Sequence, residues 1–106
     1  MLYMTHCELK GGYPVPAKQW LQIALKGMED VARYQEQGKV VLHVGYAGRQ
    51  GGTIIWDVDS HEELMRILSQ LPFWPFMEWE IIPGLSIEQT MASLKQALGA
   101  VRASKR

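Results

Sequence analysis

Residues 39–58 have the sequence KVVLHVGYAGRQGGTIIWDV, and this stretch decides the fold. Its first part, residues 39–46, and its last part, residues 53–58, are rich in β-branched and aromatic residues, which favour strands. The segment between them, residues 47–52, is glycine-rich and typical of a turn. Because both runs are too short for a long helix, we predict two strands joined as a hairpin.

A strand and a helix are expected before this hairpin. Residues 1–9 are mostly apolar or β-prone and end at a pair of glycines, as expected for a strand followed by a turn. Pro16 suits the first turn of a helix, and Gly38 suits its end. Between Ala17 and Gln37 the apolar residues recur at steps of three and four, which predicts an amphipathic helix. These residues are Trp20, Leu21, Ala24, Met28, Val31 and Ala32.

A second helix and a fourth strand are expected after the hairpin. Ser60 and Glu63 form a capping box, and Pro72 ends the apolar periodicity that follows it. Residues 76–82 then alternate apolar side chains with glutamates, which is typical of a strand with one buried face. The order strand, helix, strand, strand, helix, strand predicts a ferredoxin-like α+β fold. Both helices should cover one face of an antiparallel sheet.

One more helix is expected at the C-terminal end. Ser86 and Gln89 form another capping box, and an apolar stripe follows on one helix face. We expect residues 102–106 to fray. The sequence thus predicts a ferredoxin-like domain over residues 1–85 and an amphipathic helix and tail over residues 86–106. The stripe consists of Ile87, Met91, Leu94, Leu98 and Val101.

Composition and charge exclude several classes of function. The chain has 106 residues, enough for one core, and its 11 basic residues balance its 11 acidic ones. This balance argues against a nucleic-acid partner. The only cysteine, Cys7, has no intrachain partner, and no apolar run approaches the length of a membrane span. We therefore expect a cytoplasmic protein without a membrane partner.

The predicted sheet has apolar residues on both faces. Ile54 and Trp56 should face one side of their strand and Ile55 the other, while Tyr3 and Met4 should lie on opposite faces of the first strand. Because two helices cover only one face, we expect a homodimer or larger assembly. In the alternative, the C-terminal helix covers the second face of its own chain.

Residues 56–78 also carry a resemblance to a known family. The run WDVDS at residues 56–60 and the run LPFWPFME at residues 71–78 resemble the third strand, second helix and fourth strand of the muconolactone isomerase-like family. The opening MLY and the segments 16–18 and 47–48 fall into register. The resemblance covers residues 1–85. It implies a ferredoxin-like fold, pairing of two sheets into a dimeric α/β barrel and a ring-like larger oligomer.

The sequence departs from this family where its chemistry is expected. The second strand of such isomerases is rich in Arg, His and Trp, but here it carries Val41, Leu42, Val44 and Gly45. The acidic residue of the family's first helix, plausible as a proton shuttle, is matched by Gly27 or Met28, with Glu29 nearby. The C-terminal helix has no matched counterpart.

His43 and Arg49 are the candidates for chemistry, within a cavity between the sheet and the first helix. An imidazole exchanges protons near neutral pH, and a guanidinium binds carboxylates. We therefore predict His43 as the catalytic residue and Arg49, Tyr46 and Trp56 as ligand-binding residues. In the alternative, His43 is a structural histidine, Arg49 is a solvated turn residue, and the aromatic residues form the core.

Other site types find little support in the sequence. His6 and Glu8 alternate on one strand and could bind a metal with His43 only if all three converged. Cys7 lies within a strand, where a thiol is normally buried and inert. We expect no metal and no cofactor. The resulting hypothesis is an isomerase or a binder of a small unsaturated carboxylate or lactone. A non-catalytic binding or assembly module is the alternative.

Overall fold

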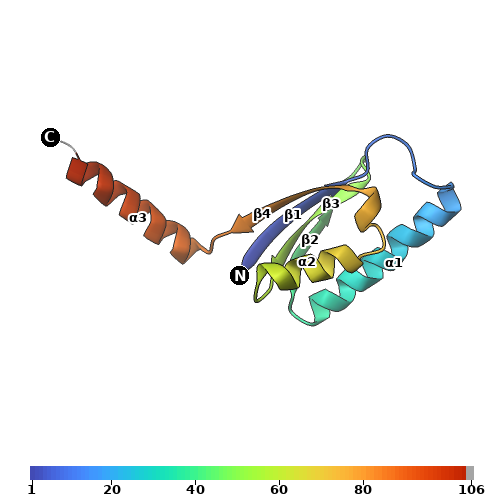
Figure 1. The fold of residues 1–106 in the computed structure, drawn as a ribbon, viewed down its shortest axis with the longest axis horizontal. Coiled ribbons are helices and arrows are strands. Elements are labelled where there is room, and N and C mark those ends of the chain that lie inside the picture. Colours follow the sequence, from blue (N-terminus) through green and yellow to red (C-terminus); the bar gives the residue numbers. More distant parts are fainter. Residues whose placement is uncertain (105–106) are drawn as a thin grey trace.

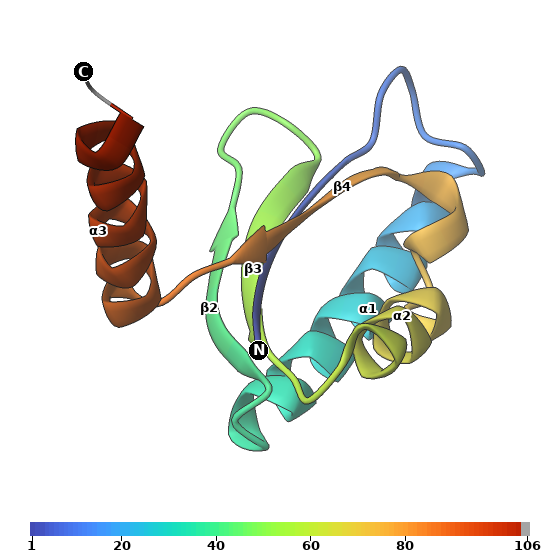
Figure 2. The same cartoon turned by 60° about the vertical axis from the view of Figure 1, so that its left-hand side comes forward.

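The computed structural model describes residues 1–104 and has the predicted ferredoxin-like α+β fold. The sheet has the strand order β2-β3-β1-β4, with antiparallel neighbours, and helices α1 and α2 lie on the same face (Figures 1 and 2). The elements are β1 (Leu2–Glu8), α1 (Ala17–Glu36), β2 (Val40–Gly45), β3 (Gly51–Asp57), α2 (His61–Gln70), the 3-10 turn η1 (Trp74–Phe76), β4 (Glu78–Gly84) and α3 (Ile87–Ser104).

Some boundaries differ from the sequence prediction. Phe76 was expected in the fourth strand but ends η1, where its backbone N–H donates to the Phe73 carbonyl at 3.1 Å. Pro75 lies within this turn, and the strand begins only at Glu78. The last helix continues to Ser104, so the fraying expected from residue 102 is not seen for residues 102–104. Residues 105 and 106 lie outside the described part of the chain.

The core lies between the sheet and the two helices. On β1, alternate residues Tyr3, Thr5 and Cys7 are buried, and the Trp56 indole N–H donates to the Thr5 hydroxyl at 2.9 Å. This alternation is the period of a strand with one covered face. The largest fully buried side chains are Trp20, Trp56, Tyr3, Leu64 and Leu68.

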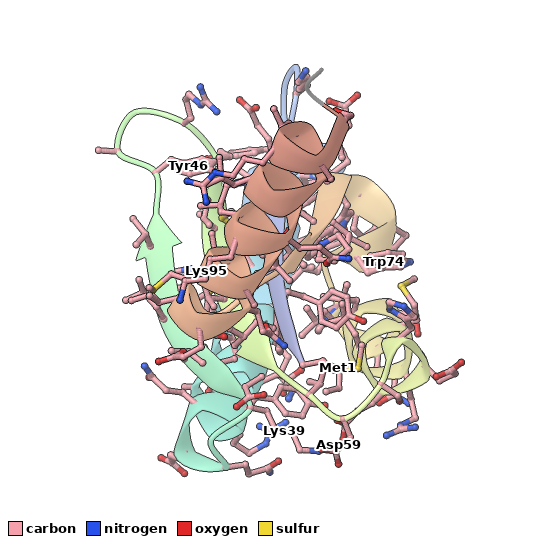
Figure 3. All side chains as sticks on the ribbon, turned by 90° about the vertical axis from the view of Figure 1, so that its left-hand side faces the viewer. Met1, Lys39, Tyr46, Asp59, Trp74 and Lys95 are labelled. Carbon is pink, nitrogen blue, oxygen red and sulfur yellow. The ribbon has the colours of Figure 1, made fainter. Side chains whose placement is uncertain are left out.

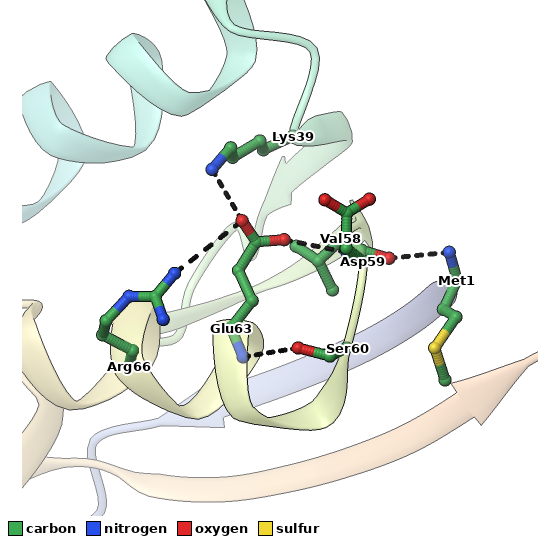
Figure 4. A network of polar contacts seen from close by, with 7 residues as sticks. All are labelled: Met1, Lys39, Val58, Asp59, Ser60, Glu63 and Arg66. Atoms are coloured by element: carbon green, nitrogen blue, oxygen red, sulfur yellow. Dashed lines mark hydrogen bonds and ion pairs between the residues drawn. The ribbon is translucent and has the colours of Figure 1, made fainter.

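A polar network fixes the start of α2 against the sheet (Figure 4). The Ser60 hydroxyl accepts a hydrogen bond from the Glu63 backbone N–H at 3.1 Å, which confirms the predicted cap. The Glu63 carboxylate accepts from Lys39 and from the Asp59 backbone N–H, each at 2.8 Å. The hydrogen bond from Lys39, followed by that from Asp59, lowers the pKa of Glu63. The network thus joins α2 to the beginning of β2.

The second face of the sheet stays uncovered. Leu42, Val44 and Ile82 are exposed there, and α3 stands away from the sheet and buries none of its residues (Figures 1 and 2). The radius of gyration is 17.8 Å. A compact chain of this length would have about 13 Å. The last helix therefore does not cover its own sheet in this structure. Within residues 1–104, no helix has the length and apolar character needed to cross a membrane.

Candidate functional site

An irregularity in β2 decides which way His43 faces. Val40 pairs with Trp56 and is buried, so simple alternation would point Leu42 and Val44 inward as well. The register shifts between Val40 and Leu42, and His43 pairs with Ile54 on the helix-covered face. One extra residue in a strand reverses the faces of those that follow. The bulge therefore turns the imidazole toward α1.

A cavity of about 310 Å³ lies on this side, between α1, η1 and the β2–β3 hairpin. Three of the four residues proposed from the sequence line it, namely His43, Tyr46 and Arg49. No carboxylate lines it, and most of its wall is apolar, as is common for pockets that take small organic ligands. The apolar wall includes Trp20, Ala24, Met28, Ile54, Phe73 and Met77.

The surroundings of the half-buried His43 ring favour its neutral form. Burial alone lowers its pKa, and within residues 1–104 no side chain is hydrogen-bonded to the ring. Gly52 leaves room for it, because a Cβ at that position would lie 3.2 Å from His43 Nε2 and 2.9 Å from the Val44 carbonyl oxygen. A neutral imidazole with a free nitrogen can accept a proton from a ligand or donate a hydrogen bond to it.

Tyr46 and Arg49 lie at the rim between this cavity and the open sheet face. The Tyr46 hydroxyl is within hydrogen-bond distance of His6 Nδ1 (3.1 Å) and Thr53 Oγ1 (2.8 Å), both on the open face. Arg49 pairs with Glu8 at 3.1 Å, and its guanidinium carbon lies 5.0 Å above the Tyr46 ring. Figure 3 places Tyr46 at the hairpin end of the molecule, opposite Met1 and Lys39.

A second hollow, of about 430 Å³, lies on the open face and shares Cys7, Tyr46 and Arg49 with the first. Its other lining residues are polar or charged, except for one tryptophan. Arg49 therefore borders both hollows and is the cation nearest to the apolar cavity. The other residues are His6, Glu8, Lys10, Glu78, Trp79 and Glu80.

Trp20 lines the cavity, whereas Trp56, which the sequence analysis proposed as a ligand-binding residue, lies in the core. Trp56 is fully buried, uses its N–H on Thr5 and does not line the cavity. Trp20 does line it, and its buried indole N–H has no hydrogen-bond partner within the described residues. An unpaired buried donor costs about 1–3 kcal/mol. The sequence offered Trp20 as one of several aromatic residues that could line a pocket, but its place on the apolar stripe of the first helix equally suits a core residue.

Neither Gly27 nor Met28, the two positions matched to the family's acidic residue, carries a carboxylate, and Gly27 packs against an aromatic ring. A Cβ on Gly27 would overlap the ring of Phe73, so only glycine fits beside that ring without rearrangement. Met28 lines the cavity, and Glu29 is exposed and does not. At Gly27, the difference from the family's sequence pattern therefore corresponds to the Phe73 ring packed directly against the backbone of α1.

Metal and thiol chemistry receive no geometric support. His6 pairs with Thr53 on the open face, opposite to His43, so the two histidines do not converge. Among residues 1–104, no three metal-type side chains gather closely enough to hold an ion. Cys7 is buried, as predicted, and burial raises the pKa of its thiol. Such a thiol is a poor nucleophile.

Comparison with solved structures finds the same fold in known proteins. A 5-chloro-2-hydroxyhydroquinone dehydrochlorinase from Burkholderia phenoliruptrix AC1100, solved with 2,5-dihydroxybenzoquinone, shares the fold with a TM-score of 0.59 at 13% identity, over 83% of this chain and 97% of that one. A crystal structure of muconolactone isomerase aligns with a TM-score of 0.70 and 28% identity, over 80% of this chain and 88% of that one.

Sequence comparison agrees with the structural one. The muconolactone Delta-isomerase of Cupriavidus pinatubonensis (strain JMP 134 / LMG 1197) is 30% identical over 83 residues, which are 78% of this chain and 90% of that protein. Residues 1–86 match the family described as muconolactone delta-isomerase, and α3 lies beyond the match. The chain therefore belongs to the muconolactone delta-isomerase family.

Proposed function

We propose that this protein binds a small unsaturated carboxylate or lactone in the cavity between α1 and the sheet, and that His43 exchanges a proton with it. The observation that most directly supports this proposal is the position of the His43 ring in the wall of an apolar cavity of about 310 Å³. The pKa of this ring is lowered, and it has no hydrogen-bond partner within the described residues. A base that is neutral near pH 7 is suited to abstract a proton beside a carbonyl. The ligand would be a cytoplasmic metabolite.

Trp20 supports a ligand that carries an acceptor oxygen. Its unpaired indole N–H belongs to a residue of the cavity wall. A carbonyl or carboxylate oxygen at that point would accept this hydrogen bond and remove the cost of the orphaned donor. A donor placed next to a carbonyl also stabilises the negative charge that develops when a neighbouring proton is removed.

Arg49 supports a negatively charged ligand. Among residues 1–104 it is the only lysine or arginine in the cavity wall, and its present partner, Glu8, lies across the rim. A guanidinium can bind two acceptors at once, so a ligand carboxylate could share Arg49 with Glu8 or replace it. The Tyr46 ring below the guanidinium restricts where it can move.

A binding module without catalysis is the second candidate, and a specific observation favours it. Gly27 and Met28, the two positions in α1 matched to the family's acid, carry no carboxylate, Gly27 is packed against Phe73, and no carboxylate of residues 1–104 lines the cavity. Proton transfer usually needs one group to remove the proton and another to return it or stabilise the charge. Without a second such group, the same cavity would bind a ligand and leave it unchanged.

One experiment separates these candidates. Lactones, unsaturated carboxylates and aromatic acids are screened by thermal shift, because a ligand of the native state raises Tm. A ligand found in this way is incubated in D2O with wild type and His43→Gln, and deuterium uptake into the ligand is measured. Uptake by the wild type alone supports proton exchange by His43. Binding without uptake supports the binding module, and the absence of any stabilising compound would overturn both.

The contribution of charge is measured with the same ligand. Arg49→Ala should weaken binding of a carboxylate by about tenfold to a hundredfold, the loss of one charge-assisted hydrogen bond. Arg66→Ala is the matched control, because Arg66 is a similarly exposed arginine on α2 outside the cavity wall. Equal affinity in wild type and Arg49→Ala would show that Arg49 is only a solvated turn residue.

A further inference from the structure

Helix α3 presents an apolar stripe that its own chain leaves uncovered. Its residues are between 50% and 75% exposed, and α3 projects away from the domain (Figure 1). The helix spans 18 residues, or about 27 Å at 1.5 Å per residue. Most of the stability of helices in proteins comes from packing of an amphipathic face, so such a helix is normally held by a contact. The stripe consists of Ile87, Met91, Leu94, Leu98 and Val101.

The spacing of the stripe indicates what covers it. Its members follow each other at steps of four, three, four and three, which is the a and d pattern of a heptad repeat. Met91 and Leu98 take the a position, and Ile87, Leu94 and Val101 take the d position. A helix that packs on a sheet normally needs a broader apolar face than this narrow seam. The seam therefore fits one partner helix.

The charges beside the seam fit a second copy of the same helix. The e positions are occupied by Glu88, Lys95 and Arg102, so the charge changes sign along this edge of the helix. Glu88 and Arg102 lie at equal distances in sequence from Lys95. An interface between two identical surfaces must be complementary to itself. The charges of α3 meet this condition when the second helix runs in the opposite direction, because Glu88 of each copy then lies near Arg102 of the other.

We propose that α3 pairs in antiparallel orientation with α3 of a second copy. In an antiparallel pair, a residues face d residues and e positions face e positions. Full overlap then places Met91 opposite the second copy's Val101, and Leu94 opposite its Leu98. In this register each Glu88 lies beside the other copy's Arg102. The two Lys95 side chains meet near the centre, where their long stems can turn the charges to solvent.

A parallel pair of α3 helices would leave the charged side chains of the e positions without partners of opposite charge. Its e positions face g positions, which are Thr90, Ala97 and Ser104, and none of these can pair with Glu88 or Arg102. The antiparallel pair also needs only α3, which lies outside the residues shared with the family. It therefore links copies independently of any contact between sheets.

Charge substitutions in the full-length protein test the register. Glu88→Arg and Arg102→Glu should each weaken self-association about tenfold, because two attractive pairs become repulsive. The double variant Glu88→Arg with Arg102→Glu should recover the wild-type value. Gln96→Arg and Gln96→Glu are matched controls at the outer f position and should change nothing. Failure of the double variant to recover would overturn the register.

Two further measurements test the contact itself. By light scattering, Leu94→Glu should halve the mass of the assembly, and circular dichroism checks that the domain stays folded. An unchanged mass would overturn the proposal.

Under oxidation, Met91→Cys and Val101→Cys should form covalent dimers only when the two variants are mixed. The wild type, whose Cys7 is buried, measures any cross-linking that does not involve α3. Cross-linking of either variant alone would show a parallel pair and overturn the antiparallel one.

Discussion

Burial of the His43 ring makes the stability of the folded chain depend on pH near neutrality. Its pKa in the folded state lies below the ordinary value of 6.5. As the pH falls from about 7 to about 5, the unfolded chain binds a proton at this ring before the folded chain does, so the free energy of unfolding decreases. His43→Gln removes this contribution and should lose less stability over the same interval.

Urea unfolding at several pH values measures the difference between wild type and His43→Gln. The interval lies above the ordinary values of 3.8 and 4.5 for Asp30 and Glu63. Burial would raise the pKa of Asp30, but hydrogen bonds and charge from Lys26 and Arg33 outweigh it, and the pKa is lowered. Both carboxylates therefore lose their contribution only at lower pH. Parallel curves for the two proteins would contradict a lowered pKa of the half-buried His43.

Gly27 is expected to be intolerant of any side chain. A Cβ there overlaps the Phe73 ring, so Gly27→Ala should cost about 1–3 kcal/mol of unfolding free energy through overpacking. The cost should be smaller in a Phe73→Leu background, because the smaller side chain leaves space. Gly99→Ala is the matched helical control, since a Cβ there meets no atom within 4 Å. Equal costs in both backgrounds would exclude a Gly27–Phe73 clash.

Muconolactone itself should be turned over very slowly or not at all. The positions matched to the family's polar second strand carry Val41, Leu42, Val44 and Gly45, and the positions matched to its acid carry Gly27 or Met28. His43 alone would then have to remove and return the proton. We expect a rate far below the 1–1000 per second of ordinary enzymes, measured by the absorbance change of the lactone. A rate within that range would contradict this expectation.

The site illustrates how far the residues alone could be interpreted. His43, Tyr46 and Arg49 were identified from their residue types and from the glycine-rich turn, and all three line one cavity. The face that His43 occupies depends on the bulge after Val40, which no composition or periodicity reveals. Trp20 and Trp56 could not be distinguished, because both are large apolar residues at positions that suit a core.

At the scale of elements, two helices with the same cap should respond differently to its loss. The Ser60 hydroxyl caps α2 and the Ser86 hydroxyl caps α3, each accepting a backbone N–H at 3.1 Å. Ser60→Ala should cost about 1 kcal/mol, because α2 packs into the core. Ser86→Ala should leave the unfolding midpoint of the domain unchanged, because α3 buries no residue. Equal losses in urea unfolding would show that α3 is part of the folding unit.

Local signals explain why these elements could be predicted. Both capping boxes were visible as a serine followed three residues later by Glu63 or Gln89, and each serine hydroxyl accepts a backbone N–H. Gln89 accepts in return from the Ser86 N–H, whereas Glu63 accepts from the Asp59 N–H, one residue before the cap. The start of β4 was misplaced because the aromatic run before Glu78 suits a strand equally well. Instead, the backbone N–H groups of Trp74 and Phe76 donate to the carbonyls of Leu71 and Phe73, and the Trp79 indole donates to the Trp74 carbonyl at 3.1 Å. Apolar alternation alone does not distinguish this turn from the first residues of a strand.

For the whole molecule, the element order was sufficient to predict the sheet topology but not the position of α3. Antiparallel ferredoxin-like sheets follow from strand and helix order because connections are short and crossovers are right-handed. Only three residues after β4, α3 begins without a tertiary contact that would define its direction. From the sequence, the open sheet face could be covered either by a second copy or by this helix. In the structure α3 stands away from the sheet.

The uncovered sheet face predicts self-association of the domain, independently of α3. Leu42 and Val44 on β2 and Ile82 on β4 are exposed, and burying apolar surface stabilises an interface by about 25 cal/mol per Å². We expect Leu42→Glu to lower the mass measured by light scattering at micromolar concentration. Leu25→Glu is the matched control, because Leu25 is also exposed but lies on α1, which covers the other face of the sheet. The same mass for wild type and Leu42→Glu would show that the sheets do not pair. A wild-type mass of 12.1 kDa, that of one chain, would rule out both self-contacts, because a single copy has no partner for either the sheet or α3.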